Sequence, residues 1–171
     1  MTTVQNLLAY EDIRRLKFQY MRALDTHDWA LMESLYIEDA VVWFGDGKYS
    51  CQGRDNIMRL YRRLLTDDFI SSHIAVHPEI DLTSETTAKA KWRFEDTVHF
   101  LAANPAVQKV HIKGGEELQG AGYYSDEYVR VDATWKIKSS GYVRIYERVE
   151  SRGTREIELI VDSRLGIKDR A

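Results

Sequence analysis

An acidic side chain interrupts the apolar face of a strand that the sequence predicts over residues 86–100. The even positions from Ala88 to Phe100 are apolar except for Asp96, whereas the odd positions between them are charged or polar. Burying a carboxylate on such a face is costly unless it has a partner, and carboxylates buried in this way are often functional groups. The alternative is a strand end or bulge that turns Asp96 towards water, and the pattern leaves both alternatives open.

Two histidines, His73 and His77, lie in a strand-like segment that precedes Asp96 in the chain. On a helix this spacing would suit a zinc site, but on an extended strand it separates the two residues by roughly 13 Å, at ~3.3 Å per residue. We therefore expect no metal site here. A histidine that faces a carboxylate can instead act as a general base. Alternation groups His73 with Ser71, opposite Ile74, and does not by itself show which face points inward.

Three further polar side chains lie where chemistry is conceivable. Tyr20 falls on the apolar stripe of a predicted helix, so its hydroxyl needs a partner near the core, although a plain core tyrosine is the common case. Asp25 lies at the end of the same helix, where an aspartate is ordinarily solvated. Arg144 lies between Tyr142 and Tyr146 and could stack on them, or it could be a surface arginine on a sheet.

The elements that must position these groups change in type along the chain. The first third has helical spacing, with one apolar stripe made by Ile13, Leu16, Tyr20, Ala23 and Leu24. Asp28 is a predicted N-cap for a short helix, residues 39–44 form a buried strand, and Gly53 precedes a third helix. From Ile70 onward the period changes to two, which predicts long strands at residues 70–82, 86–100, 121–132 and 134–149.

Helices followed by a run of strands predict an α+β fold with the helices on one face of a curved, mostly antiparallel sheet. Strands of this length curl, and a curled sheet closed by helices forms a cone with an interior. We expect a single domain over residues 1–171, with its core at about residues 10–150 and a charged C-terminal extension at 151–171 that includes a short element near 156–161.

The composition excludes several classes of function. The chain has 171 residues, a net charge of −3 and 44% apolar residues, which suits one domain with a buried core rather than a basic nucleic-acid-binding domain. Cys51 is the single cysteine and reads as a structural thiol, so a disulfide framework is excluded. No apolar run approaches the ~20 residues that span a bilayer, and no signal peptide is recognisable. We therefore expect a soluble, cytoplasmic protein without nucleic-acid or membrane partners.

Four segments together carry a resemblance to a known family: YMRALDTHDW, SSHIAVHPEI, SETTAKAKWRFED and GYVRIYE. They resemble the SnoaL-like family of cone-shaped α+β barrels, which has a cystatin-like fold and includes scytalone dehydratases. The resemblance extends from about Ile13 to Arg148, and within the family it is strongest to the bile-acid 7α-dehydratases. It implies an enzyme without cofactor or metal.

The resemblance also implies the site and the reaction. The catalytic residues would be Tyr20, Asp25, His73, Asp96 and Arg144. They would eliminate water from a hydroxylated 3-oxo steroid or bile-acid-like substrate, as a free acid or a CoA thioester. His73 would carry the proton and Tyr20 would donate to a substrate oxygen. We favour Asp96 as the carboxylate that orients His73, with Asp25 as the alternative.

Two departures from the dehydratases bear on the substrate. Residues 101–119 form a longer segment here, and Phe44 stands where the dehydratases have a tyrosine. Two other functions stay open: isomerisation or cyclisation of another polycyclic ketone at the same site, and a non-catalytic small-molecule-binding or interaction module. The relatives also lead us to expect a homo-oligomer, a trimer, with the outer sheet face as its contact.

Overall fold

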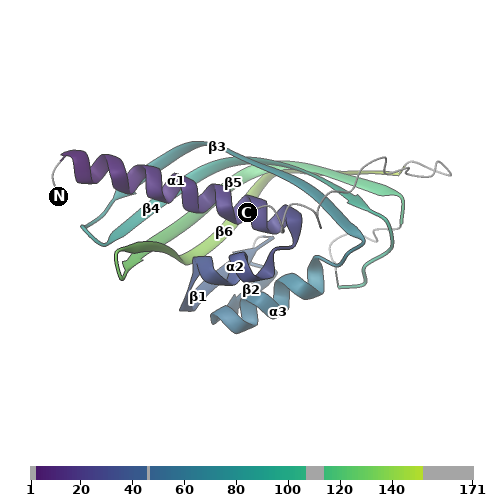
Figure 1. Cartoon of the computed structure of the whole chain (residues 1–171). Coiled ribbons are helices and arrows are strands. Elements are labelled where there is room, and N and C mark those ends of the chain that lie inside the picture. Colours follow the sequence, from purple (N-terminus) through teal and green to yellow (C-terminus); the bar gives the residue numbers. More distant parts are fainter. Residues whose placement is uncertain (1–2, 46, 107–113, 152–171) are drawn as a thin grey trace.

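Three helices pack against one side of a strongly curved six-stranded sheet in the part of the chain that the structure describes (Figure 1). This computed structural model describes residues 3–45, 47–106 and 114–151. The helices are α1 (Thr3–Thr26), α2 (Trp29–Leu35) and α3 (Arg54–Leu64). The strands are β1 (Tyr36–Phe44), β2 (Tyr49–Gln52), β3 (Phe69–Leu82), β4 (Thr87–Phe100), β5 (Glu116–Val131) and β6 (Thr134–Ser151). This arrangement confirms the predicted α+β class.

The strand order in the sheet is β2-β1-β6-β5-β4-β3. β1 runs parallel to β6, and the other neighbouring pairs are antiparallel. The four strands β3 to β6 contain 14, 14, 16 and 18 residues, long enough for the sheet to coil around the helices. β2 was not predicted, because its 4 residues are too few to establish a period.

Three expectations concern the ends and the extent of the chain. No helix among the described residues is long and apolar enough to cross a bilayer. The short element predicted near 156–161 lies outside the described residues, as does part of the segment 101–119. The single-domain organisation over 1–171 stays a prediction.

The apolar stripe of α1 is buried against the sheet, as its periodicity predicts; its members are Ile13, Leu16, Tyr20, Ala23 and Leu24. The helix ends at Thr26, and His27 then takes a positive φ of 53°. Asp28 caps α2 as predicted, because its Oδ1 accepts a hydrogen bond from the backbone N–H of Leu31 at 3.0 Å. The abrupt turn leaves Asp25 in the last turn of α1, next to the sheet.

A buried ion pair, which was not predicted, holds α1 against β5. Lys17 and Asp126 both have fully buried side chains, and Nζ of Lys17 lies 2.8 Å from Oδ2 of Asp126. The carboxylate also accepts hydrogen bonds from the hydroxyls of Tyr128 and Ser140, each at 2.7 Å. The ammonium packs 3.5 Å from the centroid of the Tyr124 ring. Because neither charge can be left without its partner, the pair fixes the position of α1 along the sheet.

An irregularity in β3 decides which of its side chains face the helices. The register with β4 shifts between Val76 and Glu79, and His77 within the shift has a positive φ of 50°. Before the shift the His73 side chain faces inward and is 8% exposed, whereas Ile74 on the other face is 54% exposed. The structure thus supplies the direction of His73 that alternation left open.

A bulge in β6 has a similar effect. Gly122 pairs with Arg144 and Ala121 pairs with Tyr146, so one extra residue lies between the two positions of β6. In a regular strand, Arg144 and Glu147 would point to opposite faces. The bulge brings both side chains to the inner face of the sheet.

Candidate active site

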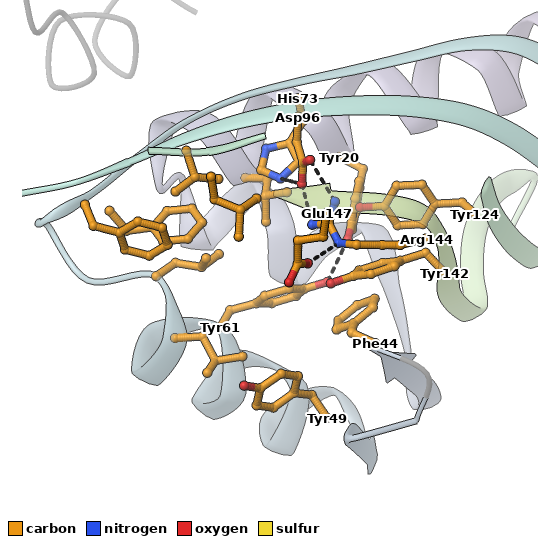
Figure 2. A pocket seen from close by; sticks show the side chains of 18 residues that line it. Tyr20, Phe44, Tyr49, Tyr61, His73, Asp96, Tyr124, Tyr142, Arg144 and Glu147 are labelled. Atoms are coloured by element: carbon orange, nitrogen blue, oxygen red, sulfur yellow. Dashed lines mark hydrogen bonds and ion pairs between the residues drawn. The ribbon is translucent and has the colours of Figure 1, made fainter. Parts of the chain in front are cut away.

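A mostly apolar cavity lies between the helices and the inner face of the sheet (Figure 2). The space open to the centres of water-sized molecules is about 140 Å³, so the molecular volume that fits is larger. Five tyrosines contribute to its wall: Tyr20, Tyr49, Tyr61, Tyr124 and Tyr142. Its polar side chains include His73, Asp96, Arg144 and Glu147. Such a setting suits an apolar ligand that a few polar contacts orient.

Asp25 and His73 form a hydrogen-bonded pair between the end of α1 and β3. Nδ1 of His73 lies 2.6 Å from Oδ1 of Asp25, and Oδ2 accepts the backbone N–H of the same histidine at 2.9 Å. The hydroxyl of Ser71 donates to Oδ1 at 2.8 Å. Because a carboxylate can only accept, Nδ1 carries a proton, and in the neutral imidazole the lone pair is on Nε2, on the cavity side. This is the arrangement of a general base held in one tautomer.

The preference for Asp96 as the orienting carboxylate was wrong. Oδ2 of Asp96 lies 3.8 Å from Nε2 of His73, beyond hydrogen-bonding distance. Its two oxygens accept instead from Nη1 and Nη2 of Arg144, at 2.8 and 2.6 Å. Gly120 makes room for this pair, because a Cβ at that position would collide with Nη1. Of the two alternatives that the pattern left open for Asp96, the structure shows the inward one, since the residue is 6% exposed.

Arg144 is therefore part of the cavity and not a surface arginine. Its Nε lies 2.7 Å from Oε2 of Glu147, so a second carboxylate shares the same guanidinium. Burial lowers the pKa of Arg144, but the hydrogen bonds and the charge of Asp96, together with Tyr142 and Glu147, raise it by more, and the net pKa lies above the ordinary value. The guanidinium carbon lies 5.4 and 5.3 Å from the ring centroids of Phe94 and Tyr142.

A chain of tyrosine hydroxyls reaches the cavity from the helices and β1. Tyr61 lies between Tyr36 and Tyr20, with O···O distances of 2.8 and 3.0 Å. Burial raises the pKa of all three phenols above the ordinary value, so each keeps its proton at neutral pH. Hydrogen bonding with Tyr61 and Tyr124 lowers the pKa of Tyr20 against this larger effect of burial. Either hydroxyl of the Tyr20–Tyr61 pair can be the donor; where Tyr61 donates, Tyr20 is free to donate its own proton to an oxygen in the cavity.

Among the cavity residues that were not predicted are Tyr61 and Glu147. Tyr61 was assigned only to the apolar face of its helix, although a phenol within such a stripe carries the same signal as Tyr20. Its ring centroid lies 5.9 Å from that of Phe44, so α3 brings a tyrosine next to this phenylalanine. Glu147 could not be found by alternation, because the bulge in β6 changes its face.

The polar groups of the cavity suit acid–base chemistry. Among residues 3–45, 47–106 and 114–151, no group of three or more His, Cys, Asp or Glu is placed to hold a metal ion. His77 is exposed, away from His73. Cys51 is half-buried, and burial raises the pKa of its thiol. The cavity offers one oriented imidazole, a tyrosine donor and an arginine shared by two carboxylates.

Solved structures of other proteins have the same fold. A candidate scytalone dehydratase from Novosphingobium aromaticivorans DSM 12444 matches with a TM-score of 0.72 and 23% identity, over 93% of this chain and 97% of its own. The hexachlorocyclohexane dehydrochlorinase LinA-type3 from Novosphingobium barchaimii LL02 matches with a TM-score of 0.75 and 14% identity, over 92% and 100%. ActVI-ORFA from Streptomyces coelicolor matches with a TM-score of 0.63 and 16% identity, over 80% and 97%.

The family itself is shown by the sequence. The SnoaL-like domain family matches residues 5–140, a span that includes Tyr20, Asp25, His73 and Asp96 and ends just before Arg144. The chain therefore belongs to the family of SnoaL-like domains.

Proposed function

We propose that the protein is a cofactor-independent carbon–oxygen lyase that eliminates water from a hydroxylated polycyclic ketone, such as a 7α-hydroxy-3-oxo-Δ4 steroid. The observation that carries this proposal is the Asp25–His73 pair, which presents Nε2 to an apolar cavity that also contains the Tyr20 hydroxyl. The relatives named as a candidate scytalone dehydratase and a dehydrochlorinase support it, because both names describe eliminations.

The reaction begins with proton removal by His73. Nε2 takes a proton from a carbon that the conjugated ketone acidifies, and the electron pair of that C–H bond moves through the enone to the ketone oxygen. The imidazolium that forms is stabilised by Asp25, which accepts its Nδ1–H at 2.6 Å. The Asp96 carboxylate, 3.8 Å from Nε2, adds a second negative charge without occupying the base.

The ketone oxygen acquires negative charge in this step and needs a donor. The Tyr20 hydroxyl supplies it; this hydroxyl is hydrogen-bonded to Tyr61 at 3.0 Å, and a proton donated by Tyr61 to the Tyr20 oxygen strengthens Tyr20 as a donor. The surrounding apolar wall excludes water, so that these few hydrogen bonds are worth more than they would be in solution.

The dienolate then expels the hydroxyl group. The C–O bond breaks, the leaving oxygen takes the proton from Nε2 of His73, and water leaves the site. The product is the conjugated dienone, and the neutral imidazole is regenerated with its Nδ1–H still on Asp25. No oxidant, reductant or metal is needed for this balance.

Conversion of a 7α-hydroxy-3-oxo-Δ4 steroid to its 4,6-dien-3-one tests the proposal, because the longer conjugation shifts the ultraviolet absorbance. We expect His73→Asn to lower the rate by roughly two to four powers of ten. His77→Asn is the matched control on the same strand: His77 is exposed, and asparagine tolerates its positive φ. An unchanged rate in His73→Asn would remove this histidine from the mechanism.

Two outcomes would indicate another function. Uptake of solvent deuterium at the acidic carbon without loss of water would indicate an isomerase that uses the same base. Tight binding without exchange or turnover would indicate a binding module. The homo-oligomeric state also stays a prediction, which light scattering can test; Ile74, Val143 and Ile145 on the sheet are 54%, 47% and 58% exposed and are available for such a contact.

A further inference from the structure

The charges around the cavity are unbalanced. Among the described residues that line it, Arg144 is the only lysine or arginine, whereas Asp96 and Glu147 are both carboxylates. Asp25 adds a third carboxylate directly behind the His73 ring. The three carboxylates outnumber the guanidinium by two charges when His73 is neutral, and by one charge when it is protonated. The cavity therefore has an excess of negative charge in either state of the base.

The single guanidinium is already occupied. Asp96 accepts from both terminal nitrogens of Arg144, at 2.8 and 2.6 Å, and Glu147 lies 2.7 Å from its Nε. Figure 2 shows Arg144 between these two carboxylates. The N–H groups of Arg144 thus already bind the carboxylates of Asp96 and Glu147, in the geometry that a substrate carboxylate would use. An anionic ligand would have to displace one of them.

The position of Glu147 makes it the outermost of these charges. The side chains of Asp96, Arg144 and Glu147 are 3%, 13% and 25% exposed, so the group becomes more accessible towards Glu147. A ligand anion would approach this carboxylate at the cavity mouth, where like charges repel each other. Because Glu147 is exposed, water screens part of this repulsion, so we expect a moderate discrimination. An uncharged ketone, hydroxyl or ester meets no such repulsion and can use the same hydrogen-bond donors.

From this geometry we infer that the cavity accepts only uncharged parts of a ligand, and that Glu147 is a specificity-determining residue that rejects carboxylates. The inference rests on the proposed function only for the choice of a steroid as ligand. It implies that an acidic substrate must be presented as an ester or thioester, or must leave its carboxylate outside.

Two matched ligand pairs test this inference by isothermal titration calorimetry at neutral pH. The first is 3-oxo-4-androstene-17β-carboxylate with its methyl ester, and the second is 2-naphthoate with its methyl ester. We expect each ester to bind about tenfold more tightly than its carboxylate. Glu147→Gln should reduce the ratio of the carboxylate's Kd to the ester's Kd at least threefold, mainly by improving carboxylate binding. The control is Glu150→Gln, which removes the same charge from an exposed pair with Arg148 and should leave the difference as it was.

The outcomes separate this inference from the proposed function. Equal binding of ester and carboxylate, an unchanged difference in Glu147→Gln, or the same effect in Glu150→Gln would overturn it, while steroid turnover could still stand. Discrimination within the naphthoate pair, with no binding of either steroid, would support the charge rule and contradict the steroid class. Failure of both pairs to bind would overturn the inference.

Discussion

Replacing Lys17 by methionine should cost far more stability than removing a surface lysine. Methionine keeps most of the length of the side chain but removes the ammonium from a pair in which neither side chain is exposed. The Asp126 carboxylate would keep its hydroxyl donors, Tyr128 and Ser140, but would be a buried charge without a counter-ion. Breaking such a pair on one side costs about 3–5 kcal/mol, out of the roughly 5–15 kcal/mol that keep a domain folded.

Removing both charges should restore much of that loss. Burial lowers the pKa of Lys17 by more than Asp126 raises it, so desolvation outweighs the attraction within the pair. In Lys17→Met/Asp126→Asn, the amide oxygen can still accept a hydroxyl hydrogen bond and no buried charge remains. We expect the double variant to recover about 2 kcal/mol or more relative to Lys17→Met.

Urea denaturation followed by tryptophan fluorescence measures these free energies. Lys89→Met is the matched control, because Lys89 is 64% exposed and pairs with Glu127 at 3.1 Å on the surface. It should cost less than about 1 kcal/mol. The reasoning is refuted if Lys17→Met costs no more than Lys89→Met, or if the double variant is no more stable than Lys17→Met alone.

Three other measurements bear on the site. Asp25→Asn should lower kcat by roughly two to four powers of ten with a smaller effect on KM, because an amide can hold the imidazole in the wrong tautomer; steady-state elimination kinetics check this. Tyr61→Phe should lower kcat about tenfold, since Tyr20 loses the hydrogen-bond partner that polarises its hydroxyl when Tyr61 is the donor. An unchanged kcat would show that the Tyr36–Tyr61–Tyr20 hydrogen bonds do not assist catalysis. In an alkaline titration at 295 nm, the buried phenols Tyr20, Tyr36 and Tyr61 should ionise only as the fold is lost. Their folded pKa is raised above the unfolded value, so their contribution to stability is present below about pH 10 and is lost above it.

Much of the fold could be predicted from local patterns in the sequence. The stripe of α1, the cap at Asp28 and the four long strands all follow from spacing and side-chain type over a few neighbouring positions. The inward direction of Asp96 was one of two alternatives offered by the same kind of pattern, because β4 alternates without interruption. Each of these features depends on residues that are close together in sequence.

The pairing within the site depends on contacts over long separations. Asp25 and His73 are 48 positions apart, as are Asp96 and Arg144. Nothing in the neighbouring sequence shows that His73 pairs with Asp25 rather than with Asp96. The parallel contact of β1 with β6 is a property of the whole sheet. The directions of the His73 and Glu147 side chains depend on register shifts in β3 and β6, and such shifts leave no periodic pattern in the sequence.

Tyr20 and Asp25 lie on one uninterrupted helix, so the spacing between their backbone positions is fixed. At about 1.5 Å per residue, the two side chains start about 7.5 Å apart along the helix axis. On the proposed chemistry, one end of this interval binds the substrate oxygen and the other, through His73, receives the proton. At about 100° per residue the two positions also lie about 140° apart around the helix, so the helix fixes their spacing at the backbone and the side chains set the distance between the reacting atoms. Inserting one residue between them would rotate one of the two side chains by about 100° around the helix axis, away from the cavity. The spacing of Tyr20 and Asp25 therefore cannot change in small steps within α1.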